Sequence, residues 1–103
     1  MAKPIPHPDI GQIDLSVVLD ALSDPVRRSI VRRLHAAKEA SCGAFCDEAA
    51  KTNLTYHFGK LREAGLTRTR IEGPYRQISL RLEEIEARFP GLLPAVIAAS
   101  ERE

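Results

Sequence analysis

The stretch that decides the fold is KTNLTYHFGKLREAGLTRTRIEGPYRQISL, residues 51–80. In its first half, apolar side chains recur at Leu54, Phe58 and Leu61, the i, i+4, i+7 spacing of a helix with one buried face. The helix is expected to end at Gly65, because glycine readily adopts the left-handed conformation that often closes a helix. The pattern therefore predicts a helix anchored by three apolar side chains.

If these side chains point inward, helical spacing turns a polar edge of the same helix outward. Hydroxyls, an amide, a phenol and amines can donate or accept hydrogen bonds at base edges in the major groove of DNA. Each residue also has an ordinary interpretation: Thr52 can cap the helix, Asn53 can be a polar first-turn residue, and Tyr56 can be half-buried. Their combination with a basic hairpin favours nucleic-acid binding. The predicted contacts on this helix are Lys51, Thr52, Asn53, Thr55, Tyr56 and Lys60.

The second half of the stretch predicts a β-hairpin. Two alternating runs rich in β-branched residues, 66–71 and 75–80, flank a turn that contains glycine and proline. Residues two apart share one face of a strand, so Arg68 and Arg70 are expected on the same face, with Arg76 on the partner strand. Such arginines can hold phosphates or enter a narrow minor groove. The alternative is a charged, solvated hairpin.

Two helices are predicted before this stretch. Asp14 is placed to cap a helix over 15–22, and Asp24 followed by Pro25 is a strong start signal for a second helix over 25–37. The second helix is expected to bury Val26, Ile30, Val31 and Leu34 and to turn Arg27, Arg28, Arg32 and Arg33 to solvent.

The remaining segments carry weaker signals. Residues 1–12 contain three prolines spaced two apart, which predicts a flexible or extended N-terminal arm ahead of a single domain over 13–100. Residues 39–50 are weakly patterned and are expected to hold one short helix around 44–50. After the hairpin, a helical turn is expected over 83–86.

A final apolar helix is predicted after Pro90 and Gly91. On so small a domain, the apolar faces of the first and last helices are better explained by a partner chain than by solvent. The alternative is that both faces pack entirely within their own chain. The predicted interface of a homodimer is Leu15, Val18, Leu19, Leu92, Leu93, Val96 and Ile97.

Length and composition fit one ordinary domain. The chain has 103 residues, of which 44% are hydrophobic and 28% charged. No apolar run approaches a membrane span and no secretory signal opens the chain, so a cytoplasmic location with no membrane partner is expected. The net charge of +1 hides a segregation: residues 25–81 hold twelve Lys or Arg against five Asp or Glu, a net of +7. A basic centre can face a polyanion, although it is more often a solvated surface.

Cys42 and Cys46 are the only cysteines. Two thiolates are fewer than the four ligands of a closed zinc site, so no metal is assigned. Three interpretations stay open: structural cysteines, a thiol redox sensor, and a metal or metalloid site. Residues 82–103 contain no histidine, so a metal site with histidine ligands on the last helix is excluded.

In order, these elements are those of a winged helix-turn-helix, mainly α with a small β-hairpin, in which one helix enters the major groove. The sequence has no Gly-rich phosphate loop and no paired carboxylate beside a nucleophile, so it gives no indication of an enzyme. No cofactor is implied. His7 and His35 fall on the arm and on an ordinary helix, whereas His57 can touch a phosphate or pack beneath its helix. The alternative function is a winged-helix module whose basic face docks an acidic partner.

Two stretches, LDALSDPVRRSIVRRL (19–34) and 51–80, resemble the ArsR family of bacterial repressors over 46 of the 103 residues. The most specific part runs from Tyr56-His57-Phe58 to Ala64-Gly65-Leu66 and into an Arg-rich hairpin.

This resemblance implies a homodimer, formed by the first and last helices, that binds an imperfect palindrome of double-stranded DNA. It implies a repressor that blocks a promoter until an unidentified inducer lowers its affinity. It also implies that residues 52–64 form the recognition helix. Two departures stand out: the segment 36–51 is shorter than usual, so the first helix of the reading pair is expected to be reduced or irregular, and Tyr56 stands where histidine is frequent. The implied base contacts are Thr52, Asn53, Thr55 and Tyr56.

Overall fold

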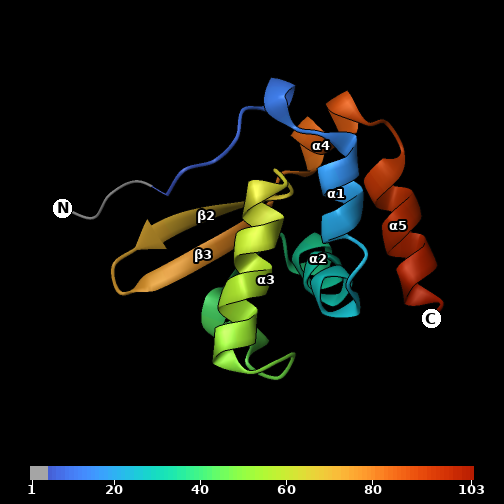
Figure 1. The fold of residues 1–103 in the computed structure, drawn as a ribbon. Helices are drawn as coiled ribbons and strands as arrows, with labels where there is room; N and C mark the ends of the chain where they lie inside the picture. Colours follow the sequence, from blue (N-terminus) through green and yellow to red (C-terminus); the bar gives the residue numbers. More distant parts are fainter. Residues whose placement is uncertain (1–4) are drawn as a thin grey trace.

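The computed structural model describes residues 5–103, a helical body from which a β-hairpin projects (Figure 1). The predicted mainly α fold with a small hairpin is observed. The helices are α1 (Leu15–Ala21), α2 (Pro25–Ala37), α3 (Lys51–Glu63), α4 (Leu82–Arg88) and α5 (Leu92–Glu101), with 3₁₀ turns η1 (Ile10–Gln12) and η2 (Cys42–Phe45). The strands are β1 (Glu39–Ser41), β2 (Thr67–Glu72) and β3 (Tyr75–Leu80).

The first two helices begin where the sequence predicts. The Asp14 side chain caps α1, and Asp24 Oδ1 accepts hydrogen bonds from the backbone N–H groups of Val26 at 2.8 Å and Arg27 at 3.1 Å. Pro25 takes the first position of α2, where its missing N–H costs nothing. Burial raises the pKa of Asp24, but the two backbone hydrogen bonds and the nearby positive charge together lower it more, so the pKa lies below its ordinary value. The cap is therefore a carboxylate.

Arg27 departs from the solvent face that the sequence predicts for α2. It is only 7% exposed. Its Nε donates to the Ala21 carbonyl at 2.6 Å and its Nη2 to the Asp20 carbonyl at 3.3 Å, while Nη1 lies 3.2 Å from His57 Nδ1. The last carbonyls of a helix lack partners within that helix, so this arginine satisfies the end of α1. The other arginines of the predicted solvent face, Arg28, Arg32 and Arg33, are half-buried, as is Val26 of the predicted buried face.

The segment between α2 and α3 also differs from the prediction. In place of a helix over 44–50, the chain forms β1 and then the single 3₁₀ turn η2, and residues 46–50 have no helix or strand. β1 pairs antiparallel with β3, with Glu39 opposite Ser79. A three-residue strand with so distant a partner leaves no periodic signal in the sequence. The expected reduction of the first reading helix is thus observed as η2.

The predicted hairpin consists of β2 and β3, and the sheet has the order β1-β3-β2. Thr67 lies opposite Leu80 and Glu72 lies opposite Tyr75, which leaves residues 73–74 as a two-residue turn. Because opposed residues share a face of the sheet, the pairing assigns every hairpin side chain to one of two faces. The buried members of one face are Thr67, Thr69 and Ile78.

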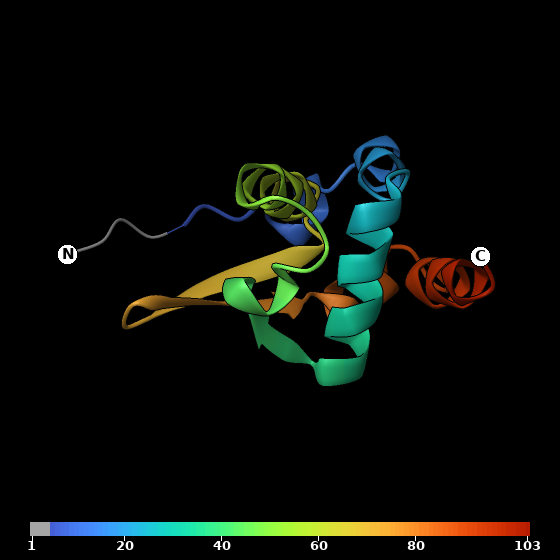
Figure 2. The ribbon, with the colours of Figure 1, turned by 90° about the horizontal axis from the view of Figure 1, so that it is seen from below.

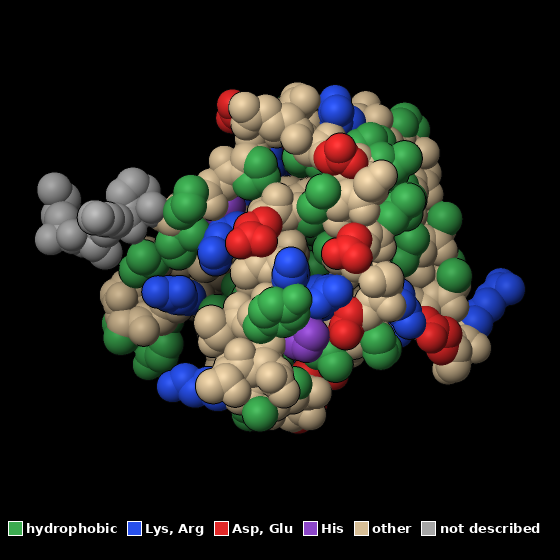
Figure 3. Space-filling model, in the orientation of Figure 1, with side chains coloured by type: hydrophobic (Ala, Val, Ile, Leu, Met, Phe, Trp, Pro, Cys, Tyr) green, Lys and Arg blue, Asp and Glu red, His purple; other side chains and the backbone are tan. Residues whose placement is uncertain are grey.

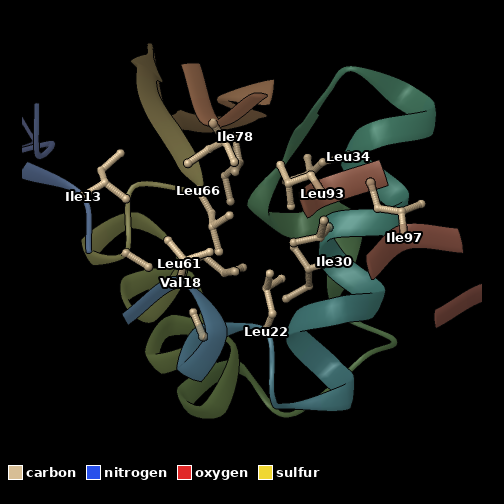
Figure 4. Close-up of a cluster of buried hydrophobic side chains, with 14 of the residues drawn as sticks. Ile13, Val18, Leu22, Ile30, Leu34, Leu61, Leu66, Ile78, Leu93 and Ile97 are labelled. Carbon is tan, nitrogen blue, oxygen red and sulfur yellow. The ribbon is translucent and has the colours of Figure 1, made fainter. Parts of the chain in front are cut away.

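One hydrophobic core joins these elements (Figure 4). Side chains from the helices meet Leu66 and Ile78 from the base of the hairpin, and both are fully buried. The tail forms α4 and α5 where a helical turn and an apolar helix are predicted. The labelled core residues in Figure 4 are Ile13, Val18, Leu22, Ile30, Leu34, Leu61, Leu66, Ile78, Leu93 and Ile97.

The chain before α1 lies against the sheet. The backbone N–H of Thr69 donates to His7 Nε2 at 3.0 Å, and Arg81 Nη1 donates to the Pro8 carbonyl at 2.8 Å. Burial and nearby arginines lower the pKa of His7, which keeps its imidazole a neutral acceptor. β2 is an edge strand, so His7 covers one of its free N–H groups. Among the described residues, the first regular element is η1, directly before Ile13.

The arm predicted over 1–12 is only partly described, because its first four residues lie outside the described residues. Its flexibility, and the division into an arm and a domain over 13–100, stay predictions.

Gly65 closes α3 in the predicted left-handed conformation, with φ of +83°. A methyl group at this position would lie 2.5 Å from Ile13 Cγ1. Ile13 is itself buried at 2% exposure and cannot move aside freely. The glycine therefore both turns the chain and leaves room for the residue that leads into α1.

Gly65→Ala is expected to lower the free energy of unfolding by about 2–5 kcal/mol, because the left-handed conformation costs ~1–2 kcal/mol and overpacking against Ile13 costs ~1–3 kcal/mol. The matched control is Gly59→Ala, inside α3 with nothing within 4 Å of the added methyl. It is expected to raise stability by about 0.5–1 kcal/mol. Urea denaturation followed by circular dichroism measures both, and equal effects would contradict the account.

Arg27→Met is expected to lower the free energy of unfolding by about 1–3 kcal/mol, because the Ala21 carbonyl at the end of α1 loses its buried donor. Methionine keeps much of the aliphatic volume. Arg102→Met, at the exposed C-terminal end of α5, is the control and should stay within about 0.5 kcal/mol of the parent. The role assigned to Arg27 fails if both variants unfold at the parent's urea concentration.

Candidate nucleic-acid interface

The polar edge predicted for α3 is exposed. Leu54 is 5% and Leu61 0% exposed, and Phe58 packs half-buried against the core, so the three predicted anchors point inward. Figure 2 shows α3 on the outer surface of the molecule, beside the hairpin. Lys60 is half-buried, and the exposed members of the edge are Lys51, Thr52, Asn53, Thr55 and Tyr56.

Contacts within α3 hold the exposed side chains of Thr55 and Tyr56 in position. The Thr55 hydroxyl donates to the Lys51 carbonyl at 3.1 Å, which fixes its rotamer while its oxygen can still accept a hydrogen bond. The Lys60 Nζ lies 5.5 Å from the centre of the Tyr56 ring, within the range of a cation–π interaction. Tyr56 remains 58% exposed. Its phenol is therefore held in position without being covered.

His57 packs beneath α3, which decides between the two alternatives for this residue. It is half-buried, and its Nδ1 lies 3.2 Å from Nη1 of the buried Arg27. A guanidinium can only donate, so His57 Nδ1 is the acceptor in this contact. Arg27 thus joins the end of α1 to the middle of α3.

The hairpin arginines lie on two faces of the sheet. Arg68 and Arg70 share one face as predicted, because they oppose Ser79 and Gln77, whereas Arg76 opposes Ile71 on the other face. The sequence prediction did not assign Arg76 to the opposite face from Arg68 and Arg70. A two-residue turn at 73–74 fixes which residues of the two strands oppose each other, and so it contains this information. Arg76 lies on the side of the sheet that faces α3, where it lines a cleft with Lys51, Thr55 and Thr69.

Arg68 and Arg70 are bound to carboxylates on the other face. Arg68 Nη2 lies 2.9 Å from Glu84 Oε1, and Arg70 forms ion pairs with both Glu39 and Glu72. These contacts raise the pKa of Arg70, first through the hydrogen bond to Glu72. A phosphate would have to replace these carboxylates before either arginine could hold DNA.

Four cations near α3 have no such partner. Within residues 5–103, no carboxylate lies within ion-pair distance of Lys51, Lys60, Arg62 or Arg76. Arg62 is absent from the predicted site. The signal for it was the i, i+4, i+7, i+11 spacing of positions 51, 55, 58 and 62, which places them along one side of the helix. The structure thus groups free positive charge beside the polar edge.

Neither cysteine forms a disulfide; Cys42 is half-buried in η2 and Cys46 is exposed. Burial raises the pKa of the Cys42 thiol, against the opposing charge of Arg76, so this thiol is a weak nucleophile. Among the residues that the structure describes, no three His, Cys, Asp or Glu side chains gather as a metal site would need. Redox sensing by Cys42 and Cys46 stays a prediction.

The predicted dimer surface is only partly available. Val18, Leu93 and Ile97 are at most 5% exposed within the single chain, so they have almost no surface left for a partner, which corrects their assignment. Leu15 is 44% and Leu19 47% exposed. Hydrophobic side chains gather over α1 and α5, on the side away from the hairpin (Figure 3). Leu92 and Val96 on α5 are half-buried.

No helix within residues 5–103 combines the length and the apolar character that a membrane crossing requires.

Comparison with known proteins agrees with this geometry. A family model described as a helix-turn-helix domain matches residues 22–70, from the end of α1 into β2. An uncharacterized HTH-type transcriptional regulator of Bacillus subtilis (strain 168), YceK, is 42% identical over 79 residues, which cover 74% of this chain and 79% of YceK.

The fold is similar to the crystal structure of an ArsR family transcriptional regulator. The TM-score is 0.64 at 24% identity, over 85% of this chain and 92% of the other. Family and fold are those of DNA-binding regulators and not of enzymes. The chain belongs to the helix-turn-helix transcriptional regulators, and it has the winged helix-turn-helix fold of an ArsR-like protein.

Proposed function

We propose that this protein is a transcriptional repressor that binds an imperfect palindrome of double-stranded DNA as a homodimer. It blocks a promoter by occupancy, performs no chemistry itself, and is released by a signal. The observation that carries the proposal is the exposed edge of α3: residues 51–60 contain no acidic side chain, and the free cation Arg76 lies on the adjacent face of the hairpin. This role requires access to DNA, and the predicted cytoplasmic location is consistent with it.

Bases and phosphates are contacted by different side chains. Thr52, Asn53, Thr55 and Tyr56 have the hydrogen-bonding groups that can distinguish base pairs in the major groove. Unpaired cations neutralise phosphates without reading sequence. The side chains proposed to hold phosphates are Lys51, Lys60 and Arg76.

Arg68 and Arg70 contribute less in this proposal. Each leaves a carboxylate to bind a phosphate, so the gain from the new contact is offset by the loss of an ion pair. Both are more than half exposed, where solvent screens such ion pairs and they contribute little to stability. They remain secondary phosphate contacts.

Fluorescence anisotropy with a duplex from the gene's own upstream region tests this proposal. Lys51→Gln and Arg76→Gln are each expected to weaken binding about three- to tenfold and to reduce the slope of log K against log salt by about one, because each removes one phosphate contact. Asn53→Ala should lower the preference for this duplex over a scrambled one by about 1–3 kcal/mol.

Lys38→Gln is the control for charge, because Lys38 is exposed at the end of α2 and does not line the cleft beside α3. It should leave both affinity and salt slope close to those of the parent. If the parent binds the scrambled duplex equally well at every salt concentration, the protein does not read sequence. If duplex DNA does not compete with an acidic partner protein for the basic face, the interaction module is the better description.

The homodimer is proposed to form through the side of the molecule away from the hairpin. Leu15 and Leu19 are exposed on α1, and the half-buried Leu92 and Val96 extend the apolar surface on α5. A two-fold axis on this side would present two copies of α3 to half-sites about one helical turn apart.

Leu19→Glu is expected to convert the dimer into a monomer of 11.4 kDa, because it places a charge in the apolar contact. The matched control is Ile71→Glu, since Ile71 is similarly exposed at 41% but lies on the hairpin. Light scattering after size-exclusion chromatography measures the mass of each variant. A parent that is monomeric at tens of micromolar, or a Leu19→Glu variant that stays dimeric, would refute this interface.

A further inference from the structure

A cleft of about 570 Å³ lies between η2, one side of α3 and the inner face of the hairpin. This volume is within the range of roughly 300–1,000 Å³ that is usual for sites of small molecules. Two kinds of side chain make up most of its lining, one apolar and one cationic, beside the hydroxyls of Thr55 and Thr69.

The first kind forms an apolar wall. Leu54 and Phe58 come from α3, and Cys42 and Ala49 from the segment before it. The Phe58 ring meets the fully buried Phe45 edge to face, with ring centres 5.7 Å apart, and the Arg33 guanidinium lies 4.6 Å from the centre of the Phe45 ring. Phe58 is thereby supported from behind.

The second kind is positive charge without a partner. Lys51, Arg62 and Arg76 line the cleft, and no Asp or Glu does. The only other ionisable groups there are two thiols, and burial holds Cys42 in its neutral form. Three cations around an apolar wall therefore have no counter-charge from residues 5–103.

We propose that this cleft binds a small organic anion with an apolar body. A carboxylate or sulfonate meets Arg62 and Arg76, and a ring or alkyl chain packs on Leu54 and Phe58. An inorganic anion would leave the apolar wall unused, and a neutral molecule would leave the guanidinium groups unpaired, so the two halves of the cleft together select the class of ligand.

The site has a consequence for regulation that rests on the proposed function. Lys51 and Arg76 are also proposed to hold DNA phosphates, so a bound anion neutralises them and competes with DNA. A ligand lowers affinity only by as much as it binds the free protein better than the DNA complex, and shared cations provide that difference. The ligand is thus an inducer that acts at the DNA-binding face and not at a remote site.

Isothermal titration of the full chain without DNA tests the site directly. 2-Naphthoate and decanoate serve as probes with an aromatic and an alkyl body, and 2-naphthamide and acetate lack the charge or the body. Saturable binding of at least one probe, about tenfold tighter than its control, is expected. The proposal is overturned if neither probe binds, or if 2-naphthamide and 2-naphthoate bind equally.

Three variants locate the bound probe. Arg62→Gln, which is outside the proposed DNA contacts, should weaken binding of the probe about tenfold because it removes a charged hydrogen-bond donor. Ala49→Trp should abolish binding by filling the cleft, and Arg62→Gln keeps the test decisive if Ala49→Trp does not fold. Arg102→Gln, on α5 and outside the cleft, should bind like the parent. Parent-like binding by Arg62→Gln would place the probe elsewhere and refute the site.

Fluorescence anisotropy with DNA then tests whether anion binding in the cleft also lowers the affinity for DNA. The bound probe should weaken the parent's affinity for the upstream duplex about tenfold at saturation, and the same probe concentration should have a much smaller effect on Arg62→Gln. A probe that saturates the cleft without changing DNA affinity overturns the competition. If the parent binds no DNA, the proposed function fails, while the titration without DNA still decides whether the anion site exists.

Discussion

The burial of Leu54 and Leu61 is the constraint on which the rest of this structure depends. Two fully packed side chains two turns apart leave a helix only one possible rotation about its axis. That rotation decides which groups of α3 are presented outward, and it turns Lys51, Thr55 and Arg62 toward the hairpin. The polar edge and the charged cleft therefore both follow from the way these two leucines pack in the core.

Arg27 extends this constraint from the core to the polar contacts around it. A buried guanidinium is tolerated only where its donors are satisfied, and here two carbonyls at the end of α1 and one ring nitrogen on α3 provide the acceptors. A small rotation of α1 against α3 would break this arrangement. The helix that carries the proposed dimer contact and the helix that carries the proposed base contacts are thus held in one geometry, as a dimer with fixed half-site spacing requires.

Sequence could predict the parts of this fold that arise from neighbours along the chain. The caps at Asp14 and Asp24, the spacing of the apolar residues in α3 and the turn at 73–74 are all local, and each is observed. β1 was missed because it exists only through its pairing with β3. Arg27 was misplaced because its spacing matches its exposed neighbours, and only the position of α1 makes it buried.

Of the predicted interface, the helix edge was accessible to sequence reasoning and the cleft was not. The cleft depends on the segment between α2 and α3, which contributes Cys42, Gly43, Cys46, Ala49 and Ala50 to its lining. In this segment a single 3₁₀ turn stands in place of a full helix, and the side chains that the segment contributes to the cleft are small. A longer helix with larger side chains would fill the space beside Phe58. The short segment between α2 and α3 therefore leaves open the space in which we propose that an apolar anion meets Arg62 and Arg76.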